Sequence, residues 1–472
     1  MRTLIHWESD TDLCLIKSFW GRVSANQSID TLLLRDYDIR GGDVFFSIMH
    51  HFLKRLWRLE LCGNNIDVVG AHAFAEILSS RDCKLKQLDL TGSMKSSVWK
   101  TIVHGLSSPC RLLSLDIQEA DMNNECMAHL SNVLINSHLI LLKILNCNNI
   151  TTVGWQALSL PLRSSSCSLE GLCIGAYEYC CGVNNNVAAS LANALSSSNS
   201  KLMVLNLATE CLTTTGIEAF KLALQNPHSK LEQLDLGVVN ALASADENKA
   251  AIVTLCSALV NNHRLKDVSF GLDQMLFNNV SIVMDIFLNL LYNTSSIIDT
   301  YLSNHTLEKI EHNVSNIPNE VRSLLELNRN NDASVAARLK VLKAHFSDGN
   351  INPFVDMNSK VYPQAISWMA KDRQGLSLLF NFVRSMEVSF DSNVARSISR
   401  RRLREGLAFI ASHNGRGRGT HMTIPSWITS RPDRLSAKKN SQAFDSVVPS
   451  SSAQAWRRQK LQLIRPFDYG NL

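Results

Sequence analysis

The feature of the sequence that most constrains the fold is a repeated unit of about 28 residues. Its clearest copy, LWRLELCGNNIDVVGAHAFAEIL, begins at Leu56 and has the form LxxLxLxxNxL followed by apolar residues spaced by four. A second copy, KLMVLNLATECLTTTGIEAFKLAL, repeats these apolar positions from Leu202 to Leu224. Weaker copies begin at Ile29, Leu85, Leu112, Leu139, Leu169, Leu231 and Leu265. Such a unit buries its apolar face only against its neighbours, so the copies predict one continuous array.

Each unit is predicted to form one strand and one helix. In the LxxLxL segment the leucines point inward and the side chains between them point outward. The apolar spacing of four that follows, as in Gly70, Phe74 and Leu78, is typical of a helix with one buried face. We therefore expect an α/β solenoid, a horseshoe with parallel strands on the concave face and helices on the convex face. The copy at Leu139 is ambiguous, because HLILLKILNCNNI carries one extra residue between its strand and its turn.

The unit resembles the ribonuclease-inhibitor-like class of leucine-rich repeats, which also occurs in the sensor regions of NOD-like receptors and in Ran GTPase-activating proteins. The resemblance covers roughly Ile29 to Gly271. It implies protein binding through the concave face, but it identifies no particular partner. The asparagine position of the motif holds Asn64 in one copy, and the backbone groups of other turns must be satisfied differently. In those copies the position holds Tyr37, Ser93, Ala120, Tyr177, Glu210 and Val239.

The sequence divides into four predicted regions. Residues 1–28 are expected to cap the array, residues 29–273 to form about nine repeat units, and residues 274–390 to form a mainly helical extension. Residues 391–472 are expected to be a basic and largely disordered tail. The strings TYLSNHTL, SLLELNRNN, AARLKVLKAHF and AISWMAKD resemble the extension of uncharacterised ribonuclease-inhibitor-like proteins of microalgae, diatoms especially, a resemblance that implies no activity.

Charge is distributed unevenly along the chain. The tail carries 15 Lys and Arg against 5 Asp and Glu, whereas the whole chain has a net charge of +5, so the remainder is acidic. The tail includes a cluster of four arginines, Arg400, Arg401, Arg402 and Arg404. This cluster fits a nuclear-import signal, a nucleic-acid patch or a solvated tail. Because its charge is opposite to that of the body, the tail is also a candidate to lie across the array and block it.

The outward strand positions predict a binding surface on the concave face. Reading the residue between the second and third leucines of each copy gives three consecutive acidic residues, Glu60, Asp89 and Asp116. The candidate partner-binding residues are Glu60, Asp89, Asp116, Glu119, Asp121, Asn206 and Asp235. We expect the first half of this face to carry negative potential and to attract a basic protein partner. The alternative is that exposed strand positions are simply charged.

The sequence lacks the motifs of common catalytic sites. It has no GxxxxGK[ST] phosphate loop, no GxSxG elbow, no HExxH helix and no CxxC pair, so we expect no catalytic residue, cofactor or metal. Because MRTLIHWESD carries no apolar run after a basic start, we expect no export and therefore reduced cysteines. The most apolar stretch, from Ser281, is interrupted by Asp285 and Asn289, so no membrane span is expected.

The predicted function is that of a non-catalytic protein-binding scaffold in the cytoplasm. A nuclear or nucleic-acid-associated adaptor working through the arginine cluster is the first alternative. A regulator of a partner enzyme such as a GTPase is the second. Oligomeric state and partner identity do not follow from the residues.

Overall fold

The structure of the protein is a computed structural model that describes residues 2–4, 22, 25, 29–35, 42–64, 66–92, 94–107, 110–176, 182–209, 212–238, 245–271, 280–311 and 317–345. Of these, residues up to Ala337 belong to one compact unit, and those from Arg338 belong to a second. The predicted basic tail, including Arg400, Arg401, Arg402 and Arg404, lies outside the described residues.

The strands that the structure describes form one sheet, in which each strand pairs in parallel with the next one along the chain. All nine strands predicted from the leucine pattern are present. The strands are β1 (Arg2–Leu4), β2 (Thr31–Arg35), β3 (Arg58–Cys62), β4 (Gln87–Thr91), β5 (Ser114–Gln118), β6 (Leu141–Leu145), β7 (Gly171–Gly175), β8 (Val204–Ala208), β9 (Gln233–Val238), β10 (Asp267–Gly271) and β11 (Lys309–Glu311). The predicted leucine-rich repeat solenoid is therefore confirmed.

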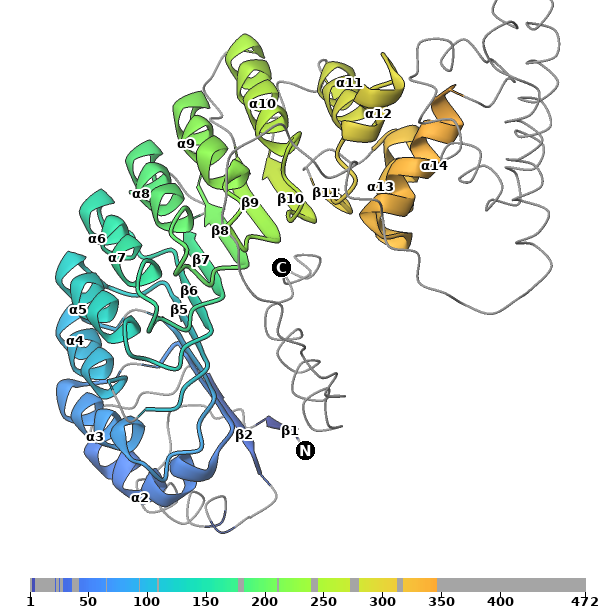
Figure 1. The fold of residues 1–472 in the computed structure, drawn as a ribbon. Coiled ribbons are helices and arrows are strands. Elements are labelled where there is room, and N and C mark those ends of the chain that lie inside the picture. The colour runs from blue at the N-terminus through green and yellow to red at the C-terminus, as the bar shows by residue number, and fades with distance from the viewer. Residues whose placement is uncertain are drawn as a thin grey trace, which may run out of the picture. The chain divides into compact units, whose positions relative to one another are not determined.

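The helices that connect the strands lie along one side of the sheet, with the strands on the inner side of the curved array (Figure 1). The helices are α2 (Gly42–Arg55), α3 (Val68–Ser79), α4 (Ser96–Gly105), α5 (Asn124–Leu134), α6 (Thr152–Ala157), α7 (Ser159–Leu162), α8 (Asn185–Leu195), α9 (Thr214–Gln225), α10 (Ala245–Leu259), α11 (Val280–Leu291), α12 (Ile297–Leu302), α13 (Asn319–Asn330) and α14 (Ala333–His345). Among the described residues, no helix is both long and apolar enough to cross a membrane.

The core lies between the sheet and the helices. In β4, the buried Leu88 and Leu90 alternate with the half-buried Gln87, Asp89 and Thr91, as the geometry of a strand requires. Aromatic side chains such as Phe74 fill the space beneath the strands. Burying one leucine or phenylalanine contributes about 2 kcal/mol, so stacking the units is the main source of stability.

The turns after the strands show how copies without the asparagine are satisfied. The Asn64 amide donates hydrogen bonds to the carbonyls of Leu34 (3.0 Å) and Cys62 (2.9 Å). In the ambiguous copy, Cys147 is buried, and its thiol donates to the carbonyl of Leu145 (3.4 Å). Strand β6 pairs with β5 and β7 without a shift in register. The extra residue of this copy therefore lies in its turn, and the strand keeps its frame.

The sheet extends past the predicted end of the repeats at residue 273. Strand β11 pairs in parallel with β10, and Leu307 and Ile310 are buried like the leucines of earlier copies. The turn before it repeats the preceding turn, because Asn304 Oδ1 accepts from the Leu307 amide (2.9 Å) and Asn262 Oδ1 accepts from the Leu265 amide (2.7 Å). At the other end, β1 pairs with β2. The segments flanking residues 29–273 therefore contribute strands to the same sheet.

Candidate binding surface on the strand face

The outward side chains of the strands form a single row, which we call the central row. Paired strands place Leu33 beside Glu60, Glu60 beside Asp89, and Asp89 beside Asp116. The row continues through Lys143, Cys173, Asn206, Asp235, Ser269 and Glu311. Neighbouring strands lie about 4.8 Å apart, so consecutive members of the row are in reach of one another. Five of the seven predicted site residues thus share one surface: Glu60, Asp89, Asp116, Asn206 and Asp235.

Basic side chains offset much of the negative charge at the start of the central row. Glu60 is buried and forms an ion pair with Arg58, two positions earlier on the same strand. Asp116 accepts from the Lys143 ammonium at 2.7 Å and from the Gln118 amide at 3.0 Å. The first half of the face is therefore a mixed surface of paired charges, less acidic than the outward residues alone suggested.

Asp89 occupies the centre of this stretch. It lies between Glu60 and Asp116, and its carboxylate accepts a hydrogen bond from the Thr91 hydroxyl at 2.9 Å. Among the described residues no lysine or arginine forms an ion pair with it. Burial, together with the nearby charges of Asp116 and Glu60, raises the pKa of Asp89 to about 6, against the opposing effects of the Thr91 hydrogen bond and the Lys143 charge. A cation from a partner would therefore stabilise the charged form of Asp89 more than that of any other acidic residue in the central row.

We expect Asp89→Asn to raise the free energy of unfolding by about 2 kcal/mol at neutral pH. The carboxyl has a pKa of about 6 in the folded chain and 3.8 in the reference state. The folded protein therefore holds this proton more tightly, and ionisation of Asp89 destabilises the fold above about pH 6. Urea unfolding of both proteins at about pH 8 and about pH 4 measures the difference.

Most of the gain should disappear at the lower pH, where Asp89 is protonated in the folded chain and roughly half protonated in the unfolded chain. Asp82→Asn serves as the control, because Asp82 is exposed in the turn after α3. An equal gain for Asp89→Asn at both pH values would contradict the assignment.

The second half of the face has its own polar contacts. The Asn206 amide donates to Asp235 Oδ2 at 2.9 Å, and the backbone amide of Gly237 donates to Asp235 Oδ1 at 3.0 Å. One strand further on, the Gln233 amide donates to Asp267 Oδ2 at 2.8 Å. Between these groups and the Asp116–Lys143 pair, the outward residues are apolar or small: Leu141, Leu145, Gly171, Cys173, Gly175, Val204 and Ala208. The strand face is thus divided into a charged part, an apolar part and a second polar part.

The other two predicted residues, Glu119 and Asp121, lie beyond the end of β5, at the edge where strands lead into helices. They border a cavity of about 590 Å³ together with Lys95, Ala120, Asn146, Asn148, Asn149 and Ala176. Asp121 accepts a hydrogen bond from the Asn149 amide, which follows the next strand. These residues therefore form a polar edge beside the strand face and are separate from the central row.

The backbone of Glu119 is in the left-handed region, with φ of 54°. The equivalent residues after the two preceding strands are Gly63 (φ 67°) and Gly92 (φ 124°), and the residue after the next strand is Asn146 (φ 56°). Glycine and asparagine tolerate this conformation, whereas other residues are strained by about 1 kcal/mol. Glu119 is thus the strained member of a recurring turn position.

We expect Glu119→Gly to raise the free energy of unfolding by about 1 kcal/mol, because it removes the strain at a left-handed position. Asn146→Gly is the matched control and should change stability by only a few tenths of a kcal/mol, since asparagine already tolerates this backbone. Thermal unfolding followed by circular dichroism measures both. A loss of stability in Glu119→Gly would show that the glutamate side chain contributes more than the strain removes.

The cysteines that the structure describes form no disulfide with one another: Cys62, Cys83, Cys110, Cys126, Cys147, Cys167, Cys173 and Cys256. Three of them, Cys83, Cys110 and Cys167, occupy the same place, two residues before a repeat leucine. Burial raises the pKa of the Cys110 thiol to about 11 and that of Cys256 to about 12. Since the thiolate is the nucleophile, these groups are unreactive at neutral pH and act as core side chains.

Sequence reasoning missed two features of the strand face. Arg58 lies two positions before the central row on β3, a position that was not read together with the row. The burial of Leu145, Cys173 and Ala208 was also missed. An alternation of period two along each strand would have placed Arg58 on the same face as Glu60.

Comparison with known proteins finds relatives with leucine-rich repeats. Human NACHT, LRR and PYD domains-containing protein 14 is 28% identical over 264 residues, which are 56% of this chain and 20% of that protein. Pig ribonuclease inhibitor is 30% identical over 187 residues, 39% of each chain. Mouse ribonuclease inhibitor is 27% identical over 186 residues, again 39% of each. The chain thus spans well under half the length of these relatives. No protein-family model matches it.

Proposed function

Since residues 29–271 form a leucine-rich repeat array of the ribonuclease-inhibitor-like type, we propose that this chain is a non-catalytic scaffold that binds a protein partner on its strand face. Two of its relatives are named ribonuclease inhibitors, a name that describes action on another protein, a ribonuclease. That comparison supports protein binding as the type of activity, but it does not identify the partner of this chain. We propose no catalytic step for the chain.

The observation that supports this proposal best is the central row itself. Strands in unbroken parallel order hold one outward side chain each, from Leu33 to Glu311, along the inner side of the array. A rigid row of this kind preorganises many contacts, so a partner loses little entropy in ordering the surface that it meets. By contrast, the edge strands that the structure describes, β1 and β11, are short, with three residues each.

The chemistry of the row favours a partner with basic groups at a defined place. Asp89 stands between two acidic neighbours whose charges are already paired with Arg58 and Lys143. A lysine or arginine of the partner that reached Asp89 would form an ion pair and relieve the repulsion there. The paired charges around Asp89 would favour a partner with polar groups in matching positions and disfavour a partner with a uniformly basic surface.

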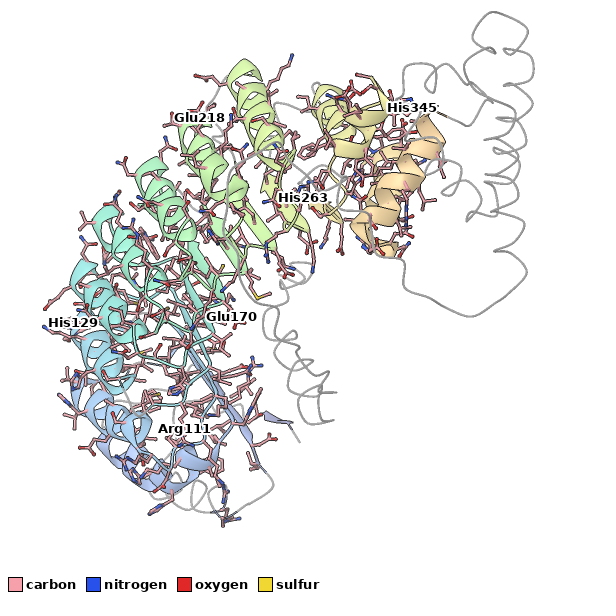
Figure 2. All side chains as sticks on the ribbon, viewed as in Figure 1. Arg111, His129, Glu170, Glu218, His263 and His345 are labelled. Atoms are coloured by element: carbon pink, nitrogen blue, oxygen red, sulfur yellow. The ribbon has the colours of Figure 1, made fainter. Side chains whose placement is uncertain are left out.

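Affinity capture with the immobilised full chain tests the proposal. We expect Asp89→Arg to abolish capture of the partner, because it replaces the carboxylate with a cation at the centre of the surface. Glu218→Arg is the matched control, since it makes the same change of charge at an exposed position of α9, on the helix side of the array (Figure 2). Equal capture by both variants would refute binding on the strand face. Failure of the unmodified chain to retain any protein would refute the scaffold function.

The arginine cluster at Arg400, Arg401, Arg402 and Arg404 supports a second candidate, a nucleic-acid-associated adaptor. Contacts to phosphates make binding fall steeply with salt, by a slope that reflects the number of cations involved. Titration of the full chain with a labelled single-stranded RNA and a labelled DNA duplex tests this reading. Absence of binding at low salt would exclude it, and binding that survives replacement of the four arginines by glutamine would also exclude it.

A further inference from the structure

Three apolar side chains on the strand face are buried although they point away from the helices. Leu145, Cys173 and Ala208 belong to β6, β7 and β8 and form a cluster separate from the main core. Their exposed fractions are 5%, 8% and 2%. Along each strand they alternate with core residues such as Ile144 and Ile174, which face the helices. We call these three residues the apolar floor.

The strand position between Leu145 and Ala208 does not account for their burial. Gly175 lies between Leu145 and Ala208 in the sheet, and it has no side chain to shield either of them. Asp116 and Asn206, which lie in the same central row on β5 and β8, are only half-buried. The floor is therefore covered more completely than Asp116 and Asn206, which lie close to it in the central row.

The surroundings of the floor restrict what can cover it. On one side Asp116 and Lys143 already form a pair at 2.7 Å. On the other side the face carries Asp235 on β9 and Asp267 on β10. Strands are about 4.8 Å apart, so Asp235 lies roughly 10 Å from the floor residue on β7. A suitable occupant has an apolar stretch and, about three residues away in extended chain, a group of cations.

The sequence contains such a stretch at residues 456–467, WRRQKLQLIRPF. Its cations Arg457, Arg458 and Lys460 precede Leu461, Leu463 and Ile464, with no acidic residue between the two groups. Residues 400–410, RRRLREGLAFI, also combine arginines with apolar residues, but Glu405 stands between them and would face the aspartates. The charge pattern therefore favours residues 456–467.

We propose that residues 456–467 of this chain seat on the apolar floor, with their leucines on β6 to β8 and their cations toward Asp235 and Asp267. This inference rests on the proposed function, because the segment then occupies the same face that binds the protein partner. The chain between His345 and Trp456 is long enough to reach any strand, at about 3.3 Å per residue. The partner has to displace the segment, which acts as a built-in competitor.

The alkylation rate of the Cys173 thiol shows whether a segment covers the apolar floor, and its measurement requires no partner. Burial raises the pKa of Cys173 to about 12, so the covered thiol reacts slowly with iodoacetamide. We expect a chain ending at residue 455 to be alkylated at Cys173 at least about tenfold faster than the full chain, because both access and the thiolate fraction rise. Mass spectrometry of the Cys173 peptide measures the rate, with the core thiol Cys126 as the internal reference.

Point variants of the full chain separate the possible occupants. Leu463→Asp with Ile464→Asp should accelerate alkylation of Cys173 as truncation does, whereas Ser451→Asp with Ser452→Asp, which adds the same charge outside the segment, should not. A synthetic peptide of residues 454–472 should protect Cys173 in the truncated chain, and the same peptide carrying the two aspartates should not.

The proposal is overturned if Cys173 remains shielded in the truncated chain, or if it reacts equally fast in the full chain. It is also overturned if Leu407→Asp with Phe409→Asp exposes Cys173 and the Leu463 and Ile464 variant does not, since residues 400–410 would then be the occupant. None of these readings involves the partner. Failure of the floor proposal is therefore distinguishable from failure of the scaffold function, which capture by Asp89→Arg decides.

Discussion

Gly175→Ala is expected to lower the free energy of unfolding by about 3 kcal/mol or more, the largest effect of a single added methyl group on the strand face. A Cβ atom at Gly175 would lie 1.9 Å from the carbonyl oxygen of Ala208 and 2.7 Å from its carbonyl carbon. The backbone of Gly175 also has φ of 123°, which L side chains rarely adopt. Both penalties fall on backbone atoms that have no rotamer to change. Urea unfolding followed by circular dichroism measures the loss.

Gly171→Ala is the matched control on the same strand and the same face. Its added Cβ would lie 2.8 Å from Cδ1 of Leu141, the end of a flexible side chain that can rotate away. We expect it to cost less than about 1 kcal/mol. If the two variants were equally stable, β7 and β8 would have to be further apart than the structure places them.

The glycine has a role in the binding surface as well as in stability. Where β7 ends, the amide of Asn146 donates to the Gly175 carbonyl at 2.8 Å, and the amide of Ala176 donates to the Ala208 carbonyl at 2.7 Å. These hydrogen bonds continue the sheet beyond its strands and hold Leu145, Cys173 and Ala208 close together. A larger residue at this position would separate the apolar floor, so Gly175→Ala should also accelerate alkylation of Cys173.

The strands and their register could be predicted from the sequence because one physical constraint repeats in every unit. A leucine at the first, fourth and sixth positions must face the core, which leaves the fifth to face outward. A slip of one residue would expose all three leucines, so the pattern determines which side chains share the central row. The pairing of Glu60 with Asp89 and of Asp89 with Asp116 follows from this constraint alone.

The charge of the surface could not be predicted in the same way. Whether Glu60 carries a free charge depends on the arginine two positions before it, and whether Asp116 does depends on a lysine from the next unit. Such contacts depend on side-chain reach across strands, and the leucine frame does not constrain them. Reading one position per strand therefore overestimated the acidity of the face.

The last strand escaped prediction for a different reason. Leu307 and Ile310 keep the spacing of the motif, but the segment between β10 and β11 is longer than in other units and holds two helices, α11 and α12. A search for a period near 28 residues passes over a unit of this length. The repeated asparagine, three residues before Leu265 and again before Leu307, was the available indication that the array continues.

Asn262→Ala is expected to lower the free energy of unfolding by about 3 kcal/mol, because it leaves several buried backbone groups without partners. The Asn262 amide donates to the Leu224 carbonyl at 2.6 Å, and its Oδ1 accepts from the amides of Arg264 (2.9 Å) and Leu265 (2.7 Å). The side chain is 4% exposed, so water cannot replace these hydrogen bonds. Urea unfolding of the full chain measures the change.

Asn199→Ala provides the control at the equivalent position, three residues before Leu202. Asn199 is exposed, and its amide donates to the Arg163 carbonyl at 3.1 Å, where water can take its place. We expect a loss of about 0.5 kcal/mol or less. The difference between the two variants isolates burial, since both remove an asparagine from the same turn, in the repeats that begin at Leu202 and Leu265. Equal losses would mean that the turn geometry, and not the buried hydrogen bonds of Asn262, joins the end of the array to the units before it.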